Sequence, residues 1–521
     1  MTGKSKIACG VAAALVALNS SSVLAQTPEP AQVAGFAAGW STSPVFTIGE
    51  SFDGYTPPGI PDGMGAFERG GNVLILSNHE LSSGSGYPYQ LANGAVLTGA
   101  RVSALTLDKA TREVVSFGPA FDTIYNRAGN SVTGPADLDF GGLNRLCSAG
   151  SAVRGQAGFV DDIFFTGEET GGGTEFALDV ATGELWALPW LGRAAWESVA
   201  ALEVPGINRT HVAILIGDDR GDAPLLLYVG EKLPGGNFVE RNGLSYGKLY
   251  MWVADNGDLS PADWNSTGAS RHGRFVEVVN YDASMANQEG YDELGFATQA
   301  NIDGQKADIG AFNFSRPEDL HVNPRRGDQV VFASTGRNTA LNQGADLWGT
   351  TYLVDVKINP GRIRNDNITA EITILYDGDD SDKRDFGIRS PDNLVWADNG
   401  YVYIQEDRSI GGFGADSGQE TSIWQLDPQT YEVTRIAQVD RSAIPAGQTD
   451  FAPADLGNWE SSGVIDVTEE FDAEGTLLFF NVQAHSLNGG AIAAEGLVQG
   501  GQYLFLGSDE AGINPGKGRR K

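Results

Sequence analysis

The feature that most constrains the fold is a short phrase that recurs along the chain. It consists of an alternating apolar stretch, an aspartate, a polar turn and a second alternating stretch. Apolar residues that recur with a period of two, bounded by Asp, Gly and Thr, are typical of a β-hairpin. Successive copies lie about 70 residues apart in places, which is longer than the 40 to 45 residues of a WD40 blade. The copies occupy residues 104–114, 176–185, 249–259 and 424–433.

Repeated hairpins of this kind favour an irregular β-propeller with long inserted loops. A pair of β-sandwiches is the alternative, but it does not predict one hairpin phrase recurring across the whole chain. Helical periodicity is nearly absent, and 69 glycines and 22 prolines fit many tight turns. We therefore predict one all-β domain, a β-propeller that occupies residues 35–510.

The first 25 residues have the pattern of a secretory signal peptide. Lys4 and Lys6 precede an apolar stretch, and Val23-Leu24-Ala25 is a small-residue cleavage site. We therefore expect a periplasmic or secreted protein. The stretch is too short to span a bilayer comfortably, and no later apolar run replaces it. We expect residues 26–34 and the tail, residues 511–521, to be disordered.

The charge balance limits the partners of the chain. It has 35 basic and 67 acidic residues, a formal net charge of −32. This charge repels nucleic acid and anionic membranes, so we expect neither as a partner. It serves either solubility or the binding of cations by some of the carboxylates. We expect a monomer that acts on a small molecule.

Cys147 is the only cysteine that remains once the signal peptide, with Cys9, is removed. Exported proteins normally pair their thiols. A single cysteine in this setting is a buried small side chain, an intermolecular bridge or a metal ligand. The sequence around Cys147 does not by itself decide between these roles.

Polar clusters directly follow four apolar runs, where strand ends would present them on a common face. Adjacent carboxylates repel one another unless a cation lies between or beside them. Any single pair can be a solvated turn, but several pairs at strand ends indicate a shared cation site. The clusters are Asn78-His79-Glu80, Thr166-Gly167-Glu168-Glu169-Thr170, Gly217-Asp218-Asp219 and Asn481-Val482-Gln483-Ala484-His485.

Taken in order, these clusters and several further motifs resemble the PhoX-type alkaline phosphatases. The resemblance runs from about residue 75 to residue 485, and its motifs are individually short. The further motifs are Cys147-Ser148-Ala149-Gly150, Gly192-Arg193 with Glu197, Ser315-Arg316-Pro317-Glu318, Pro391-Asp392-Asn393 and Gln405-Glu406-Asp407.

The resemblance implies a propeller of about six blades whose central site holds iron and calcium and cleaves phosphate esters. It makes Cys147 the iron ligand and Arg316 the residue that holds the phosphate, with Arg193 and Thr170 beside it. A thiolate suits iron, and clustered carboxylates suit calcium. The other metal ligands that we expect are Glu168, Glu169, Glu197, Glu318, Asp218, Asp392, His79 and Glu80.

The chain also departs from these phosphatases. Thr170 stands where they carry an asparagine that contacts the substrate, and no twin-arginine export signal is present. We therefore expect an exported metal-dependent phosphoesterase that releases phosphate from organic phosphate esters. The alternatives are a non-catalytic, calcium-stabilised propeller that binds a surface, and a propeller hydrolase that acts on a phosphodiester or a lactone.

Overall fold

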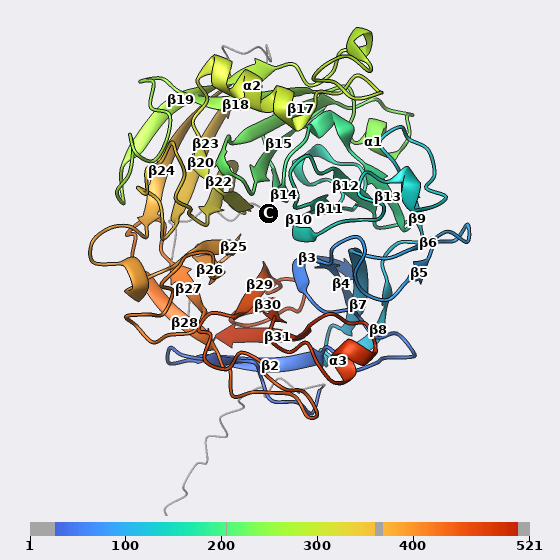
Figure 1. Ribbon diagram of the computed structural model, residues 1–521, viewed down its shortest axis with the longest axis vertical. Helices are drawn as coiled ribbons and strands as arrows, with labels where there is room; N and C mark the ends of the chain where they lie inside the picture. The colour runs from blue at the N-terminus through green and yellow to red at the C-terminus, as the bar shows by residue number, and fades with distance from the viewer. Residues whose placement is uncertain (1–26, 205, 360–367, 509–521) are drawn as a thin grey trace, which may run out of the picture.

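The recurring hairpins form outer strands of a ring of blades (Figure 1). The computed structural model describes residues 27–204, 206–359 and 368–508. The predicted signal peptide and the predicted tail lie outside the described residues. The phrases at residues 104–114, 176–185 and 424–433 form the antiparallel pairs β7–β8, β12–β13 and β27–β28, whereas the phrase at residues 249–259 begins in β18 and its partner strand β19 follows a longer connection.

The strands form six blades, and two of these blades are joined edge to edge through β19 and β24 into one nine-stranded sheet. Within each blade the strands are given from the axis outward. The first blade consists of β3 (Pro61–Arg69), β4 (Asn72–His79), β7 (Arg101–Asp108) and β8 (Val114–Pro119), and the second of β10 (Leu146–Ala152), β11 (Ile163–Glu168), β12 (Glu175–Asp179), β13 (Glu184–Ala187) and β9 (Thr123–Tyr125). The third blade consists of β14 (Trp196–Ala201), β15 (His211–Asp218), β17 (Leu226–Glu231), β18 (Lys248–Ala254) and β19 (Ser270–Val278), and the fourth of β21 (Pro317–Asn323), β22 (Arg326–Ser334), β23 (Thr350–Ile358) and β24 (Ile368–Asp377). The fifth blade consists of β25 (Pro391–Trp396), β26 (Val402–Glu406), β27 (Ser422–Leu426), β28 (Val433–Val439) and β1 (Val33–Gly35), and the sixth of β29 (Trp459–Asp466), β30 (Thr476–Ala484), β31 (Gly500–Ser508) and β2 (Trp40–Thr47).

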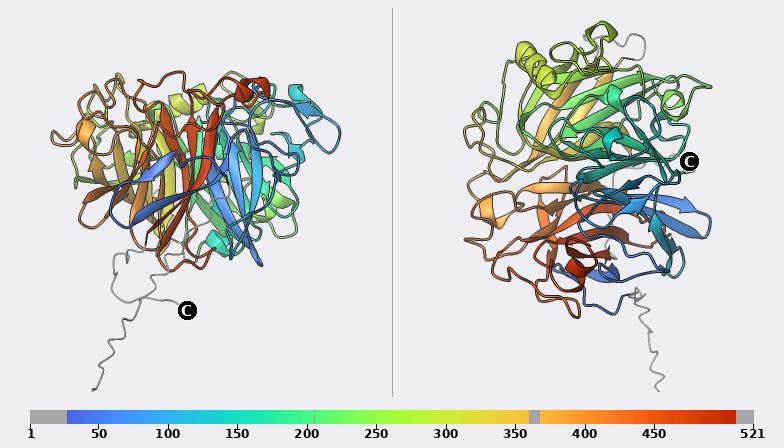
Figure 2. Two further views of the ribbon diagram at one scale, coloured as in Figure 1. Left: turned by 90° about the horizontal axis from the view of Figure 1, so that it is seen from below. Right: turned by 45° about the vertical axis from the view of Figure 1, so that its right-hand side comes forward.

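The six innermost strands close into a ring around the axis. Each of them contacts the innermost strand of the next blade, and β29 of the sixth blade contacts β3 of the first. The sixth blade combines the last three strands of the described chain with β2 from near its beginning, and β2 lies beside β31 (Figures 1 and 2). The prediction of an irregular all-β propeller of about six blades is confirmed.

The apolar runs of the sequence become the second strands of the blades. β30 is buried over its whole length, and β11 is too. A strand with neighbouring blades on both faces has no solvated side, so it reads as a continuous apolar run rather than as an alternation. The six clusters of buried apolar side chains pack in and between the blades.

Long loops and short helices connect the strands. Among the described residues, no helix has both the length and the apolar character needed to cross a membrane. The remaining elements are β5 (Tyr89–Gln90), β6 (Val96–Leu97), β16 (Gly221–Ala223), β20 (Phe314–Ser315), α1 (Phe238–Arg241), α2 (Gln299–Ile309), α3 (Ala491–Ala494) and the single-turn helices η1 (Pro135–Asp137), η2 (Gln156–Gly158), η3 (Pro189–Leu191), η4 (Ala283–Met285) and η5 (Arg384–Phe386).

The N-terminal segment corrects one expectation. We predicted disorder for residues 26–34, but residues 27–34 are held against two blades. Val33 in β1 pairs with Val439 in β28, which extends the fifth blade. The backbone N–H of Gln32 donates to Gln502 Oε1 of the sixth blade at 2.9 Å. The sequence signal for disorder, a short polar segment near a terminus, did not reveal these contacts.

Removal of this segment should destabilise the propeller. We expect deletion of residues 26–35 to cost about 3 kcal/mol or more of unfolding free energy, since each lost hydrogen bond contributes about 1 kcal/mol. Thermal unfolding of the shortened protein, compared with that of a Gln32→Ala variant that keeps the backbone pairing, measures this cost. An unchanged melting temperature after the deletion would contradict it.

Candidate functional site

One acidic or thiol side chain stands at the start of each innermost strand, directly after its first residue. We call these six residues the inner ring. From the first blade to the sixth, the first two residues of the innermost strand are Pro-Asp, Leu-Cys, Trp-Glu, Pro-Glu, Pro-Asp and Trp-Glu. The inner ring consists of Asp62, Cys147, Glu197, Glu318, Asp392 and Glu460.

A β-bulge follows the first residue of the innermost strand in five of the blades. In the first blade, Pro61 pairs with His79 and Met64 with Ser77, so two residues oppose a single residue of β4. The same shift separates Leu146 from Ala149. A bulge re-aims a side chain and increases the local twist of the strand. The corresponding shifts in the third, fourth and fifth blades lie between Trp196 and Val199, Pro317 and Leu320, and Pro391 and Leu394.

The second strands place a further set of side chains beside the inner ring. We call them the outer ring, and each is the residue that follows the end of a second strand. In each blade, the last residue of the second strand pairs with the first residue of the innermost strand. The outer ring therefore lies next to the inner ring. Its members are Glu80, Glu169, Asp219, Thr335, Asp407 and His485.

The two rings converge into three groups that each have the size of a metal site. Within each group, the possible ligand atoms lie within 4.8 Å of one another. Neighbouring groups share Cys147 or Glu197, so the three form one continuous cluster. The groups are Asp62 with Glu80 and Cys147, Cys147 with Glu169 and Glu197, and Glu197 with Glu318 and Asp392.

Glu197 lies at the centre of this cluster. The residue is only 1% exposed, and neither of its carboxylate oxygens has a hydrogen-bond partner among the described residues. Burial and the carboxylates of Glu318 and Asp219 raise its pKa well above the usual value. A buried carboxylate is costly unless it is neutralised or coordinated. Glu197 is therefore suited to bind a cation.

Cys147 is surrounded by acids. Its Sγ lies 3.2 Å from Asp62 Oδ2, and it is 8% exposed. Burial, together with Asp62 and Glu197, raises the pKa of the Cys147 thiol well above its usual value. Burial and Glu80 likewise raise the pKa of Asp62 to about 7. The thiol stays neutral in this environment unless a cation binds, because a coordinating cation deprotonates a thiol.

Two arginines occupy equivalent places in the second and fourth blades. Arg145 and Arg316 each stand two residues before an inner-ring residue, and both have positive φ, 49° and 72°. Each arginine contacts the outer-ring carboxylate of the preceding blade. Arg145 Nη2 lies 2.6 Å from Glu80 Oε1, and Arg316 Nε lies 2.5 Å from Asp219 Oδ1.

Each guanidinium also contacts a carboxylate of its own blade. Arg145 pairs with Glu169, and Arg316 Nη2 lies 3.0 Å from Glu318 Oε1. Two cationic groups therefore flank the cluster of acids on the side where the innermost strands begin.

Three of the predicted metal ligands lie outside these groups. Glu168 accepts hydrogen bonds from the Asn144 and Thr174 amides, and Asp218 pairs with Arg220 at 2.7 Å. His79 Nε2 lies 2.7 Å from Ser103 Oγ, and burial lowers the pKa of His79 to about 3. Their immediate neighbours Glu169, Asp219 and Glu80 are the residues that face the cluster.

Seven of the predicted site residues do come together in the structure. They are Cys147, Glu169, Glu197, Glu318, Asp392, Glu80 and Arg316. Arg193 does not touch the cluster. It donates to Asp139 Oδ2, to the Gly172 carbonyl and to Thr174 Oγ1, so it supports the loop after β11. Thr170 directly follows Glu169, and its amide donates to the Glu168 carbonyl.

The predicted site residues did not include Asp62, Glu460, Arg145 and Asp407, although Asp407 stands in the Gln405-Glu406-Asp407 motif of the resemblance. A signal for two of them was present in short repeats at the starts of the innermost strands. Trp-Glu-Ser occurs at Trp196 and again at Trp459, and proline precedes an acid at Pro61, Pro317 and Pro391. Comparison of these tripeptides would have added Asp62 and Glu460 to the set.

Neighbouring substitutions distinguish the two aspartates at the end of β15. If the expected substrate is a phosphate ester, Asp219→Asn should lower its kcat/KM by about a hundredfold, because the substitution frees the guanidinium of Arg316 and a misplacement of about 1 Å can have that effect. Asp218→Asn should reduce thermal stability and leave kcat/KM close to that of the wild type, because Asp218 pairs with Arg220 instead. Equal kinetic effects of the two substitutions would contradict this assignment.

The fold and the site define a six-bladed propeller with a buried cluster of acids and a thiol at its centre. A sequence profile of the family described as "Alkaline phosphatase PhoX" matches residues 181–453, more than half of the chain. The chain belongs to the PhoX alkaline phosphatase family, and it is a phosphoric ester hydrolase. Curated protein sequences contain no significant match to the chain.

A solved structure shows the same architecture. The chain is similar to Pseudomonas fluorescens PhoX in complex with vanadate, a transition state analogue, with a TM-score of 0.63, 16% identity, and 92% of this chain and 97% of that chain covered. A putative glycosidase from Bacteroides thetaiotaomicron is far less similar, with a TM-score of 0.30, 9% identity, and 73% and 87% covered. The likeness to the Pseudomonas protein shows the fold.

Proposed function

We propose that this chain is an exported phosphatase that uses iron and calcium to release inorganic phosphate from organic phosphate monoesters. The observation that carries the proposal is the continuous cluster around Cys147 and Glu197, with arginines at its edge. Export is proposed from the signal-like pattern of residues 1–25.

The donor set fits these two metals. Cys147 offers a thiolate, which suits iron, beside Glu169 and Glu197. The group of Glu197, Glu318 and Asp392 offers only carboxylate oxygens, which suit calcium. The oxygens of Glu197 have no hydrogen-bond partner among the described residues, and the pKa values of Glu318 and Asp392 are raised. Both features fit a site whose carboxylates are neutralised by cations.

The arginines fit the phosphate. A guanidinium presents a planar fork that matches two phosphate oxygens. Arg316 would hold the phosphate at the Glu318 side of the cluster, and Arg145 would hold it at the Cys147 side. Asp219 and Glu80 orient these guanidiniums through the ion pairs at 2.5 Å and 2.6 Å. The substrate therefore approaches from the side where the innermost strands begin.

The chemistry of phosphoryl transfer needs mainly positioning and charge stabilisation. Bound metal ions supply Lewis acidity and a nucleophile at neutral pH. The protein would place the phosphoryl group between the two arginines. Their hydrogen bonds to the phosphoryl oxygens stabilise charge more strongly in this partly buried site than they would in water. Thr170, next to Glu169, stands where the related phosphatases place an asparagine, and we propose that its hydroxyl makes the polar contact to substrate.

A direct assay tests the proposal. The purified protein should hydrolyse p-nitrophenyl phosphate in preference to bis(p-nitrophenyl) phosphate. Arg316→Lys and Arg145→Lys keep the charge but lose the fork, so each should raise KM for the monoester and lower the affinity for inorganic phosphate while metal content stays intact. The metal content of each variant is measured alongside its kinetics.

Two outcomes would overturn the proposed function, and a third would overturn the role given to the arginines. Calcium without any hydrolysis would indicate a binding propeller, and preference for the diester or for a lactone would indicate a different hydrolase. Wild-type phosphate affinity in both arginine variants would remove the arginines from the phosphate site.

A further inference from the structure

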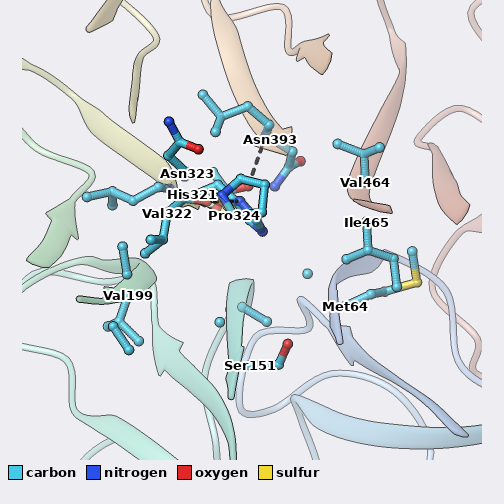
Figure 3. A pocket seen from close by; sticks show the side chains of 18 of the residues that line it. Met64, Ser151, Val199, His321, Val322, Asn323, Pro324, Asn393, Val464 and Ile465 are labelled. Atoms are coloured by element: carbon cyan, nitrogen blue, oxygen red, sulfur yellow. Dashed lines mark hydrogen bonds between the residues drawn. The ribbon is translucent and has the colours of Figure 1, made fainter. Parts of the chain in front are cut away.

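A cavity of about 320 Å³ occupies the propeller axis beyond the inner ring. All six innermost strands line it, with residues that follow the inner-ring residue in each strand. Figure 3 shows Met64, Ser151, Val199 and Val464 around the cavity. Along the innermost strands, the arginines precede the inner-ring residues and the cavity-lining residues follow the inner-ring residues. The arginines, the inner ring and the cavity, which we call the channel, therefore succeed one another along the axis.

The cavity reaches within one layer of the inner ring. Asn393, which lines the cavity, directly follows Asp392 and donates to Ser148 Oγ at 2.8 Å. Ser462 Oγ lies 2.5 Å from Asn393 Oδ1 and 2.7 Å from Asp62 Oδ1. The layer between the channel and the ring therefore contains neutral side chains with oxygen atoms, together with the carboxyl group of Asp319, which directly follows Glu318. Such oxygens are ligands that calcium accepts.

The channel end of the axis is lined by acids without a basic partner among the described residues, whereas the arginines at the other end are paired with carboxylates. Apart from His321, whose pKa is lowered by burial, every titratable side chain that lines the channel is a carboxyl group, and an adjoining cavity at its far end shares several of these residues. No lysine or arginine of the described chain lines either cavity, although Arg325 binds the Asp398 carbonyl beside them. The acidic residues of the two cavities are Glu203, Asp319, Asp398, Asp466, Glu469 and Glu470.

We infer that this channel is the path by which divalent cations reach the inner ring. Three observations carry the inference: an open axial space, a layer of side-chain oxygens below the ring, and the orphaned carboxylate of Glu197 above it. An acidic passage with low-dielectric walls concentrates cations and repels phosphate. Substrate and metal ions thus use opposite ends of one axis, so bound phosphate does not obstruct metal exchange. The inference rests on the proposed metal centre.

Ser151 gives a sharp test, because its exposed side chain lines both cavities and lies outside the metal centre. Ser151→Lys places a positive charge among the acids, and Ser151→Gln is the neutral control of similar length. The measurement is the rate at which the metal-loaded protein exchanges bound calcium for radiolabelled calcium. We expect Ser151→Lys to slow exchange at least about tenfold at low ionic strength. High salt should reduce the difference.

A second variant removes the attraction instead of opposing it. Asp398→Asn combined with Glu469→Gln should also slow exchange, with unchanged calcium content at equilibrium. Exchange in Ser151→Lys as fast as in Ser151→Gln, with both proteins fully loaded, would overturn the channel and leave the phosphatase proposal intact. Wild-type protein that binds no calcium at all would overturn both.

Discussion

Excess chelator is expected to abolish hydrolysis and to lower the melting temperature of the protein strongly. The inner ring packs five carboxyl groups and one thiol around the axis, and most of them are buried. A cation that binds only the folded state stabilises it by about 4 kcal/mol when present at a thousand times its Kd. Thermal unfolding with EDTA, compared with EDTA already saturated with calcium, measures the effect.

The loss of stability on chelation should grow as the pH rises. Without metal, burial and Glu80 raise the pKa of Asp62 to about 7, and burial raises the pKa values of Glu318 and Asp392 well above their usual range. The folded state then binds protons that the unfolded chain has released, so stability falls as the pH rises from the unfolded values through 7. We expect a larger drop in melting temperature on chelation at pH 8 than at pH 5. A drop independent of pH would contradict this account.

Glu197→Gln is expected to have the largest effect of any single substitution. The change keeps the shape of the side chain but removes the charge that two of the three groups share. Removal of a residue that only hydrogen-bonds to a metal ligand typically lowers metal affinity or activity 10- to 100-fold. Because Glu197 would itself be a ligand, we expect kcat/KM to fall at least about a hundredfold. Bound metal should fall with it.

Glu175→Gln is the matched control. Glu175 is also 1% exposed with both oxygens unpartnered among the described residues, and burial alone raises its pKa well above the usual value. It lies in β12, outside the three groups. The control should therefore keep its metal and its activity. Equal losses in both variants would show that any buried glutamate matters for folding, and would remove Glu197 from the site.

The propeller could be predicted because its outer hairpins repeat. Residues 104–114, 176–185 and 424–433 carry the same alternation with an aspartate at the turn, and each forms an outer pair of strands. The packing of the N-terminal segment, residues 27–34, could not be predicted in this way. Its stability comes from partners such as Gln502, which is far away in sequence.

The sequence located the candidate acids at the strand ends beside the cluster, but it did not show which of two adjacent acids faces the cluster. Glu168 and Glu169 are adjacent, as are Asp218 and Asp219, and a shift of one residue along a strand points a side chain to the opposite face. The sequence did not show that Glu168 binds the Asn144 and Thr174 amides. Arg145 was missed because its equivalence to Arg316 depends on the blade register, which only the structure displays.

The central claim is that the inner ring binds the metals that a phosphatase of this family uses. Elemental analysis of the natively purified wild type, beside Glu197→Gln and Glu175→Gln, tests it most directly. We expect iron and calcium in the wild type and in Glu175→Gln, and depletion of both metals in Glu197→Gln. A wild-type protein that hydrolyses phosphate monoesters without bound metal, or a Glu197→Gln variant with full metal content, would contradict it.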